Sequence, residues 1–129
     1  MFWLVFLAAL TIDQFTKLIA PMYFELVPNH GISFGWLSQL PTQVVTMGLV
    51  FIAVWIAYGL RREWQRNQLV AGLFWAGAIS NLLDRILFGG VSDWITLPYV
   101  EIKNNLADFY LLIALLLLFI KELRARYEH

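Results

Sequence analysis

The sequence predicts an all-α integral membrane protein with four transmembrane helices and short extracytoplasmic β or loop segments. Apolar residues make up 60% of the 129 residues and charged residues 14%, against roughly 45–50% and 25% in an average soluble domain. Four apolar stretches approach the length of about 20 residues that a membrane span needs, and together they use most of the chain. We therefore expect residues 1–129 to form a single membrane domain.

The first predicted span covers residues 1–20. It is uncharged from Met1 to Ile12 and then contains Asp13 and Lys17. A cleaved signal peptide is the alternative interpretation. We disfavour it because no basic region precedes the apolar stretch and two charged residues lie inside the spanning length.

The other predicted spans cover residues 43–60, 67–88 and 104–120. The second span is uncharged, and the third is uncharged until Asp84 near its end. The apolar run of the fourth span is only about 18 Å long by helical rise, which is too short to cross a bilayer alone. This helix must therefore begin before Asp108 and contain that acid.

Basic residues predict the orientation of the spans. The linker between the second and third spans and the segment after the fourth span together contain Arg61, Arg62, Arg66, Lys121, Arg124 and Arg126. The opposite side has Lys17, Arg85 and Lys103. By the positive-inside rule, both termini face the cytoplasm and the connections 21–42 and 89–103 face outward.

Both outward connections are expected to contain local structure. Residues 21–42 form a longer connection than compact domains usually leave unstructured, and Val-Pro-Asn-His-Gly at 27–31 predicts a turn. Gly89 lies where a helix C-cap is expected. Residues 91–97 then predict a short extended segment.

Four aspartates are expected near the outer membrane face. Helical rise puts Asp13, Asp84 and Asp108 about 18–27 Å from the cytoplasmic flank, in the outer half of a roughly 30 Å hydrocarbon core or at its edge. Asp93 follows the third span by a few residues and belongs at the same level. Ionisable groups at this depth usually face a cavity or a partner.

Two charged groups on the spans have expected partners. Asp13 and Lys17 are four residues apart with the acid first, which favours an intrahelical ion pair. We interpret that pair as structural more readily than as a substrate contact. Arg85 is expected to pair with a carboxylate or to extend to the outer headgroups.

The remaining polar groups support two kinds of role. Asn81 shares a helix face with Asp84, and Asn105 shares one with Asp108; such pairs can simply hold helices together. Two carboxylates in a poorly solvated site can also share one proton. The charged member then activates a water while the protonated member acts on an amide carbonyl. Spacing alone leaves open which two acids do so, although Asp93 and Asp108 are both well placed.

Four stretches carry a family resemblance. They are Asp13-Gln14-Phe15-Thr16-Lys17, Asn29-His30-Gly31-Ile32-Ser33-Phe34-Gly35, Asn81-Leu82-Leu83-Asp84-Arg85 with Gly90-Val91-Ser92-Asp93-Trp94-Ile95, and Asn105-Leu106-Ala107-Asp108. In this order they resemble the motifs of the lipoprotein signal peptidase (signal peptidase II) family of bacterial membrane aspartic endopeptidases. The chain departs from the family's usual residues at Ser80, Trp94 and Asn104.

This resemblance implies that Asp93 and Asp108 form the catalytic dyad. It implies substrate-binding or supporting roles for Asp13, Lys17, Asn29, Gly31, Asn81, Asp84, Arg85 and Asn105. The implied substrate is a prolipoprotein whose cysteine already carries diacylglyceryl, cut on the amino side of that cysteine. The implied location is the bacterial cytoplasmic (inner) membrane, in contact with membrane lipid, with the active site near the extracytoplasmic face.

Composition limits the remaining alternatives. A formal net charge of zero argues against a nucleic-acid partner. With no cysteine and no His-Glu-x-x-His pair, neither a metal nor a cofactor is expected. A small four-span transporter with Asp13, Asp84 or Asp108 as a proton relay stays open, although no paired internal repeats are apparent. A non-catalytic assembly subunit held together by Asn and Asp side chains also stays open.

Overall fold

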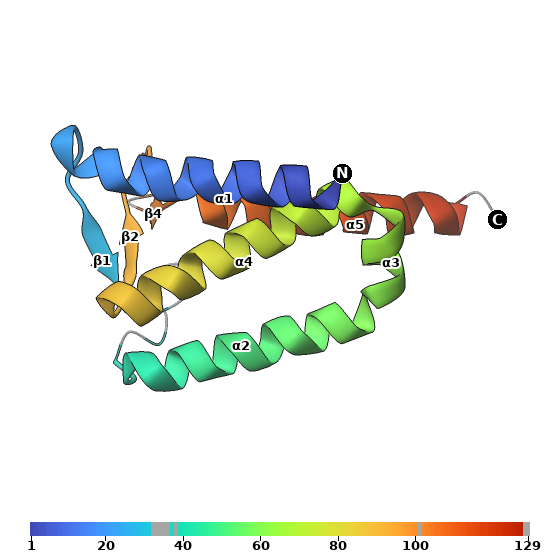
Figure 1. Cartoon of the computed structure of the whole chain (residues 1–129), viewed down its shortest axis with the longest axis horizontal. Coiled ribbons are helices and arrows are strands. Elements are labelled where there is room, and N and C mark those ends of the chain that lie inside the picture. The colour runs from blue at the N-terminus through green and yellow to red at the C-terminus, as the bar shows by residue number, and fades with distance from the viewer. Residues whose placement is uncertain (32–36, 38, 101, 128–129) are drawn as a thin grey trace.

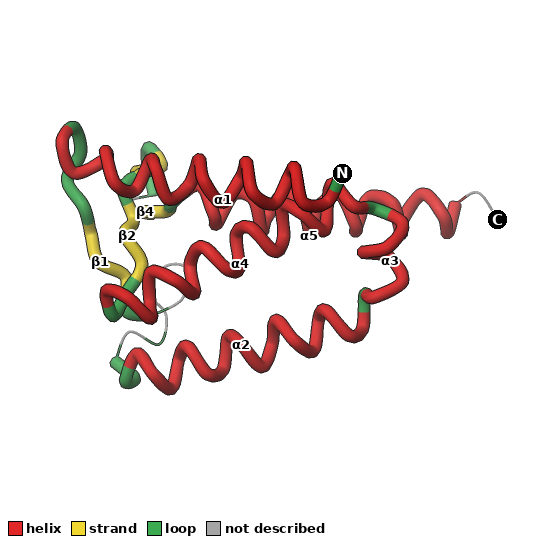
Figure 2. The backbone as a smooth tube through the Cα atoms, viewed as in Figure 1, coloured by secondary structure: helices red, strands yellow, loops and turns green. Residues whose placement is uncertain are grey.

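The computed structural model describes residues 1–31, 37, 39–100 and 102–127, and long helices dominate it (Figure 1). The helices are α1 (Phe2–Ile19), the 3₁₀ helix η1 (Ala20–Met22), α2 (Thr42–Gly59), α3 (Arg61–Arg66), α4 (Gln68–Phe88) and α5 (Leu106–Tyr127). The strands are β1 (Val27–Asn29), β2 (Val91–Asp93), β3 (Ile95–Leu97) and β4 (Ile102–Asn104). All four strands lie at one end of the helices (Figure 2).

Within the described residues, three segments are long and apolar enough to cross a membrane: Phe2–Met22, Thr42–Gly59 and Gln68–Phe88. By length and composition these three candidates coincide with the first three predicted spans. The helix α5 forms where the fourth span was predicted, but it does not join this set. Its uncharged run lies between Asp108 and Lys121 and is shorter than a full span.

The central helix is α4, which packs against α1 on one side and α5 on the other (Figure 1). Two glycines allow this close packing. A Cβ atom on Gly72 would lie 2.9 Å from Val5 Cβ of α1, and one on Gly77 would lie 2.5 Å from the Ala107 carbonyl oxygen of α5. Small residues at such contacts let helix backbones approach closely in a membrane.

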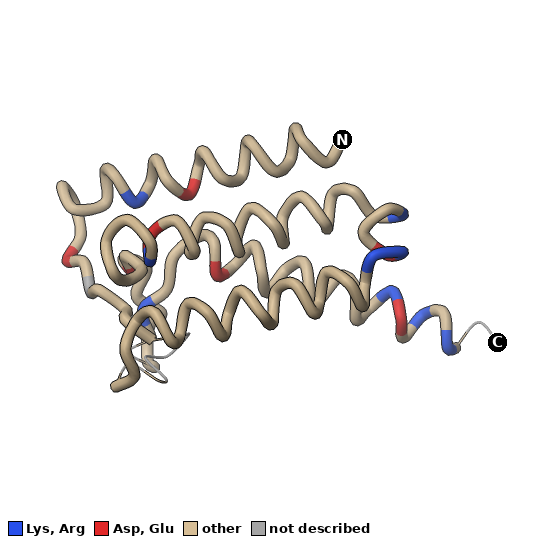
Figure 3. Tube along the Cα trace, turned by 60° about the horizontal axis from the view of Figure 1, so that its bottom comes forward, with Lys and Arg blue, Asp and Glu red and all other residues tan. Residues whose placement is uncertain are grey.

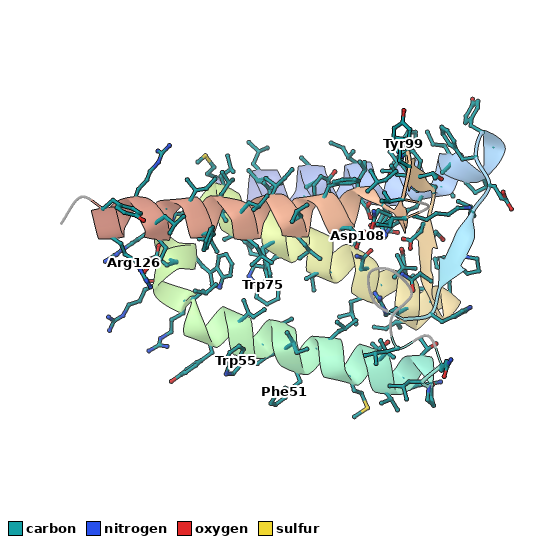
Figure 4. All side chains as sticks on the ribbon, turned by 180° about the vertical axis from the view of Figure 1, so that it is seen from behind. Phe51, Trp55, Trp75, Tyr99, Asp108 and Arg126 are labelled. Atoms are coloured by element: carbon teal, nitrogen blue, oxygen red, sulfur yellow. The ribbon has the colours of Figure 1, made fainter. Side chains whose placement is uncertain are left out.

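The helix α2 lies apart from the other three long helices (Figure 1). Val45 is the one buried residue in this fully described helix. Large apolar side chains such as Phe51 and Trp55 are 73% and 70% exposed, and both point away from the bundle (Figure 4). Such a surface suits contact with lipid tails, which are as apolar as the side chains themselves.

The connections 21–42 and 89–103 contribute the strands of two small antiparallel sheets. One pairs β1 with β2, with Asn29 opposite Val91, and the other pairs β3 with β4. The predicted turn at 27–31 is therefore wrong for its first three residues, because pairing with a distant strand holds them extended. The prediction at 91–97 is confirmed as β2 and β3, and Gly89 ends α4 in the left-handed conformation with φ 76°.

Charged residues divide between the two ends of the molecule (Figure 3). Basic residues of α3 and of the C-terminal part of α5 gather at one end, where α1 also begins (Figures 1 and 3). There Lys121 donates to Glu63 at 2.8 Å, and this hydrogen bond, opposed by partial burial, holds the pKa of the Glu63 carboxyl below its usual value. The aspartates lie toward the other end, beside the strands.

Candidate functional site

Asp93 and Asp108 come together at the end of the bundle that carries the strands. Asp93 is the last residue of β2 and is 3% exposed. Asp108 lies in the first turn of α5 and faces the same region (Figure 4). A strand end and a helix start, fifteen positions apart in sequence, thus bring two carboxylates into one polar cluster.

Each carboxylate oxygen of these two acids accepts a hydrogen bond from an asparagine. Asn105 Nδ2 donates to Asp93 Oδ1 at 2.8 Å, and Asn29 Nδ2 donates to Asp93 Oδ2 at 3.1 Å. Asn81 Nδ2 donates to Asp108 Oδ1 at 3.0 Å, and the Asn105 backbone N–H donates to Asp108 Oδ2 at 3.3 Å. Three asparagines therefore orient both acids, and Asn105 contacts each of them.

Each of the three asparagines accepts a hydrogen bond on its side-chain oxygen, and this explains how its amide group is oriented. The Gly31 N–H donates to Asn29 Oδ1 at 2.9 Å, and the Asp108 N–H donates to Asn105 Oδ1 at 3.1 Å. For Asn81 the donor is the Lys17 ammonium, at 3.1 Å from Oδ1. Since the oxygen of each amide is engaged, its NH₂ group is left to face a carboxylate.

Burial changes the acidity of Asp93. It raises the pKa of this carboxyl from its usual 3.8 to about 6, against the opposing effect of the hydrogen bond from Asn105. The negative charge of Asp108 acts in the same direction as burial, and the hydrogen bond from Asn29 opposes it. A carboxyl with a pKa near 6 can hold or release a proton close to neutral pH, which suits acid–base chemistry.

Asp13, Lys17 and Asp84 form a second cluster deeper between α1 and α4. Lys17 Nζ lies 2.7 Å from Asp13 Oδ2 and 2.6 Å from Asp84 Oδ2, and all three side chains are buried. The predicted intrahelical pair of Asp13 and Lys17 is thus confirmed. Asp84 therefore belongs to the cluster around the Lys17 ammonium and not to the pair formed by Asp93 and Asp108.

Arg85 has partners other than those predicted. Its Nη2 donates to the Gly31 carbonyl oxygen at 2.6 Å and its Nη1 to the Asn81 carbonyl oxygen at 3.2 Å, and the side chain is buried. Among the described residues no carboxylate lies within ion-pair distance of this guanidinium, so the expected ion pair or contact with the headgroups is wrong. Arg85 instead ties the Gly31 backbone, two residues after Asn29, to α4.

Three groups of the polar network were not selected as site residues from the sequence. The fully buried Ser80 donates to Asp13 at 2.5 Å and accepts from Gln14 Nε2 at 2.7 Å, and Gln14 also donates to Asp84 at 2.9 Å. The backbone N–H of Ala107 donates to Asp13 Oδ1 at 2.8 Å. Helical spacing puts Ser80 on the face of Asp84, whereas only tertiary structure brings Ala107 to Asp13.

A cleft of about 440 Å³ opens beside Asp108 between α2, α4 and α5. Its polar lining consists of Asn81, Arg85 and Asp108, and the rest of it is apolar. Trp75 points into this space from α4 toward α2 (Figure 4). The cleft can therefore take an apolar ligand and bring it to a carboxylate.

Metal ligation has no matching arrangement in the described part of the chain, where no three His, Asp or Glu side chains are placed to share an ion. The side chains of the polar site supply carboxylates, amides, the Ser80 hydroxyl, one ammonium and one guanidinium. The end of the second motif, residues 32–35, falls outside the described residues.

Membrane-length helices around an amide-lined pair of carboxylates define a multi-pass membrane protein with an enzyme-like polar site. The family described as Signal peptidase (SPase) II matches residues 5–124 of the chain. The chain therefore belongs to the signal peptidase II family, and by that membership it is a protease and a bacterial membrane protein.

Individual relatives agree with this assignment. Lipoprotein signal peptidases of Microcystis aeruginosa and Gloeothece citriformis are 33% and 32% identical to the chain, over 92% and 91% of its length and 89% and 85% of theirs. A solved structure described as a bacterial membrane enzyme is 28% identical, with a TM-score of 0.72 over 95% of this chain and 87% of that one. These relatives give no support to the transporter alternative.

Proposed function

We propose that this protein is an aspartyl endopeptidase that removes the signal peptide of prolipoproteins, with Asp93 and Asp108 as its catalytic pair. The observation that carries the proposal is Asn105, whose side chain donates to Asp93 and whose backbone N–H donates to Asp108. One residue thus holds both acids. The names of the relatives supply the substrate class, since they are lipoprotein signal peptidases.

In this mechanism the two carboxyl groups share one proton. The ionised carboxylate takes a proton from a water, whose oxygen attacks the scissile carbonyl carbon, while the protonated carboxyl donates its proton to the carbonyl oxygen. Collapse of the resulting diol returns a proton to the amide nitrogen as the C–N bond breaks. The amides of Asn29, Asn81 and Asn105 hold the oxygens of both acids throughout, which limits the reorganisation that the reaction requires.

The apolar cleft supports a lipidated substrate. It is bordered by residues of α2, α4 and α5 and reaches Asp108, so an acyl chain or an apolar signal peptide can lie in it while the peptide backbone approaches the carboxylates. We propose that the substrate carries diacylglyceryl on the cysteine that follows the scissile bond. Asp13, Lys17, Asp84, Arg85 and Gly31 support the site through the contacts described above.

The same proposal includes the topology of a single domain, residues 1–129. The helix α5 crosses the bacterial cytoplasmic (inner) membrane as a fourth span, both termini are cytoplasmic, and the site lies near the extracytoplasmic face. The basic residues of α3 and the end of α5 support this orientation, because cytoplasmic segments carry an excess of Lys and Arg.

The test is a mass-spectrometric cleavage assay in nanodiscs, with a synthetic precursor offered with and without diacylglyceryl on its cysteine. Asp93→Asn and Asp108→Asn are each compared with the wild type. Glu25→Gln, which neutralises an exposed carboxylate in the connection 21–42, away from both acids in the sequence, is the control.

We expect the wild type and the control to cut the lipidated precursor on the amino side of its cysteine, and both aspartate variants to lose at least about a thousandfold in rate. Wild-type protein that leaves the lipidated precursor intact would overturn the substrate assignment. Either aspartate variant cutting at the wild-type rate would overturn the aspartyl mechanism.

A further inference from the structure

Lys17 is a buried cation with three oxygen atoms around its ammonium. Its side chain is 5% exposed, and its ammonium contacts Asp13 Oδ2 at 2.7 Å, Asp84 Oδ2 at 2.6 Å and Asn81 Oδ1 at 3.1 Å. The two carboxylates pair with the positive charge of the ammonium, and the Asn81 oxygen accepts a hydrogen bond from it. Buried ion pairs are often no more stabilising than apolar residues of similar volume. A role beyond stability therefore has to be sought in the third contact.

That third contact leads directly to Asp108. Asn81 is the side chain that donates to Asp108 Oδ1, at 3.0 Å, and its own oxygen is the one that Lys17 contacts. Both ends of an amide have the same shape, so packing alone barely distinguishes its two orientations. Lys17 does distinguish them, because an ammonium can only donate and therefore selects the oxygen of Asn81.

We infer that Lys17 is a positioning residue for Asp108, acting through the side-chain amide of Asn81. With the ammonium present, the NH₂ group of Asn81 faces the carboxylate. Without it, the amide is free to rotate and to turn its oxygen toward Asp108, which removes a donor and brings two oxygens together. The inference rests on the proposed function, in which Asp108 is a catalytic acid.

Asp13 connects both ends of this arrangement. Its Oδ2 binds Lys17, and its Oδ1 accepts the backbone N–H of Ala107, the residue before Asp108. The same carboxylate thus fixes the cation that orients Asn81 and the helix turn that carries Asp108. Asp13 therefore holds Asn81 and Asp108 in a fixed position relative to each other. This matters because an error of about 1 Å in the position of a reacting group can cost about a hundredfold in rate.

The test is a double-mutant cycle of Lys17→Met, Asn81→Ala and the two combined, measured as kcat and KM for cleavage of the lipidated precursor. If Lys17 acts through Asn81, each single variant loses about ten- to a hundredfold in kcat, and the double variant loses no more than Asn81→Ala alone. KM should stay within about twofold in every variant, since the ground-state contacts of the substrate are unaltered.

Thr16→Val is the matched control, because it removes a hydrogen bond from the Thr16 hydroxyl to the Asp13 backbone carbonyl oxygen on the same helix without touching the side chains of Asp13, Lys17 or Asn81. Its kcat should stay within about twofold of the wild type. A Thr16→Val loss in kcat as large as that of Lys17→Met would overturn the inference, because general loosening of α1 would then explain both. Additive losses in the cycle, or a change confined to KM, would overturn it as well.

Lys17→Met leaves Asp13 and Asp84 without their cation, so the cycle is repeated on an Asp84→Asn background, where one charge of each sign is removed. If the variants fold on the Asp84→Asn background and their losses in kcat are non-additive in the same way, the result supports the inference. If the Lys17 variants unfold on both backgrounds, Lys17 is a structural residue and the inference fails. Failure of the wild type to cleave would instead overturn the proposed function itself, which keeps the two outcomes distinct.

Discussion

Asn105 and Asp108 cap the start of α5 reciprocally. The Asp108 N–H donates to Asn105 Oδ1 at 3.1 Å, and the Asn105 N–H donates to Asp108 Oδ2 at 3.3 Å. This is the geometry of a capping box, with asparagine at the cap and aspartate three residues later. The proposed catalytic acid is thus also part of the helix cap, so the local signal that starts the helix also orients the carboxylate.

Substitution of Asn105 should separate these two roles. Asn105→Ser keeps a good N-cap side chain but has no NH₂ group for Asp93, whereas Asn105→Ala loses both. We expect the serine variant to keep wild-type stability within about 0.5 kcal/mol and the alanine variant to lose about 1 kcal/mol. Both should lose at least about tenfold in kcat. Thermal unfolding and precursor cleavage measure the two effects, and an active serine variant would contradict the bridging role.

Replacing Arg85 should weaken the site through the backbone beside Asn29. Arg85→Lys keeps the positive charge, but a single ammonium cannot reproduce the fork that contacts the carbonyl groups of Gly31 and Asn81. We expect cleavage to fall about tenfold or more. The exposed Arg62→Lys is the control and should cleave at the wild-type rate. Equal rates for the two variants would contradict the role given to the guanidinium fork.

Adding a methyl group at Gly77 should force α4 and α5 apart. The new Cβ would lie 2.5 Å from the Ala107 carbonyl oxygen and 2.9 Å from Leu111 Cγ, and overpacking of this kind costs about 1–3 kcal/mol. Cleavage should fall too, because Ala107 precedes Asp108. Gly48→Ala in α2 meets no atom within 4 Å and should be neutral or slightly stabilising. Denaturation in detergent compares the pair, and equal stability would contradict the close contact.

The raised pKa of Asp93 should appear in the pH dependence of stability. Between its usual value of 3.8 and about 6 the folded state keeps a proton that the unfolded state has released, so stability falls as pH rises through this window. Asp93→Asn removes that titration. We therefore expect the fall in Tm from about pH 4 to about pH 6 to be smaller in Asp93→Asn than in the wild type. Parallel Tm curves for the two proteins would show that burial does not perturb this acid.

Local sequence determined the helices and most of their ends. Apolar runs predicted α1, α2 and α4, Gly89 predicted the end of α4, and the short apolar run after Asp108 predicted that α5 begins before that acid. The ion pair of Asp13 and Lys17 also followed from spacing, because residues four apart on a helix are neighbours. Each of these features depends on residues within a few positions of one another.

Tertiary structure alone decided the contacts between distant segments. Pairing with β2 made residues 27–29 a strand rather than part of a turn, and backbone carbonyl groups rather than carboxylates became the partners of Arg85. The separation of the aspartates into two clusters, with Asp84 on Lys17 and Asp93 on Asn105, was likewise not readable from spacing. Sequence periodicity specifies which face of a helix is polar, but only the packing of several elements decides which polar groups on those faces meet.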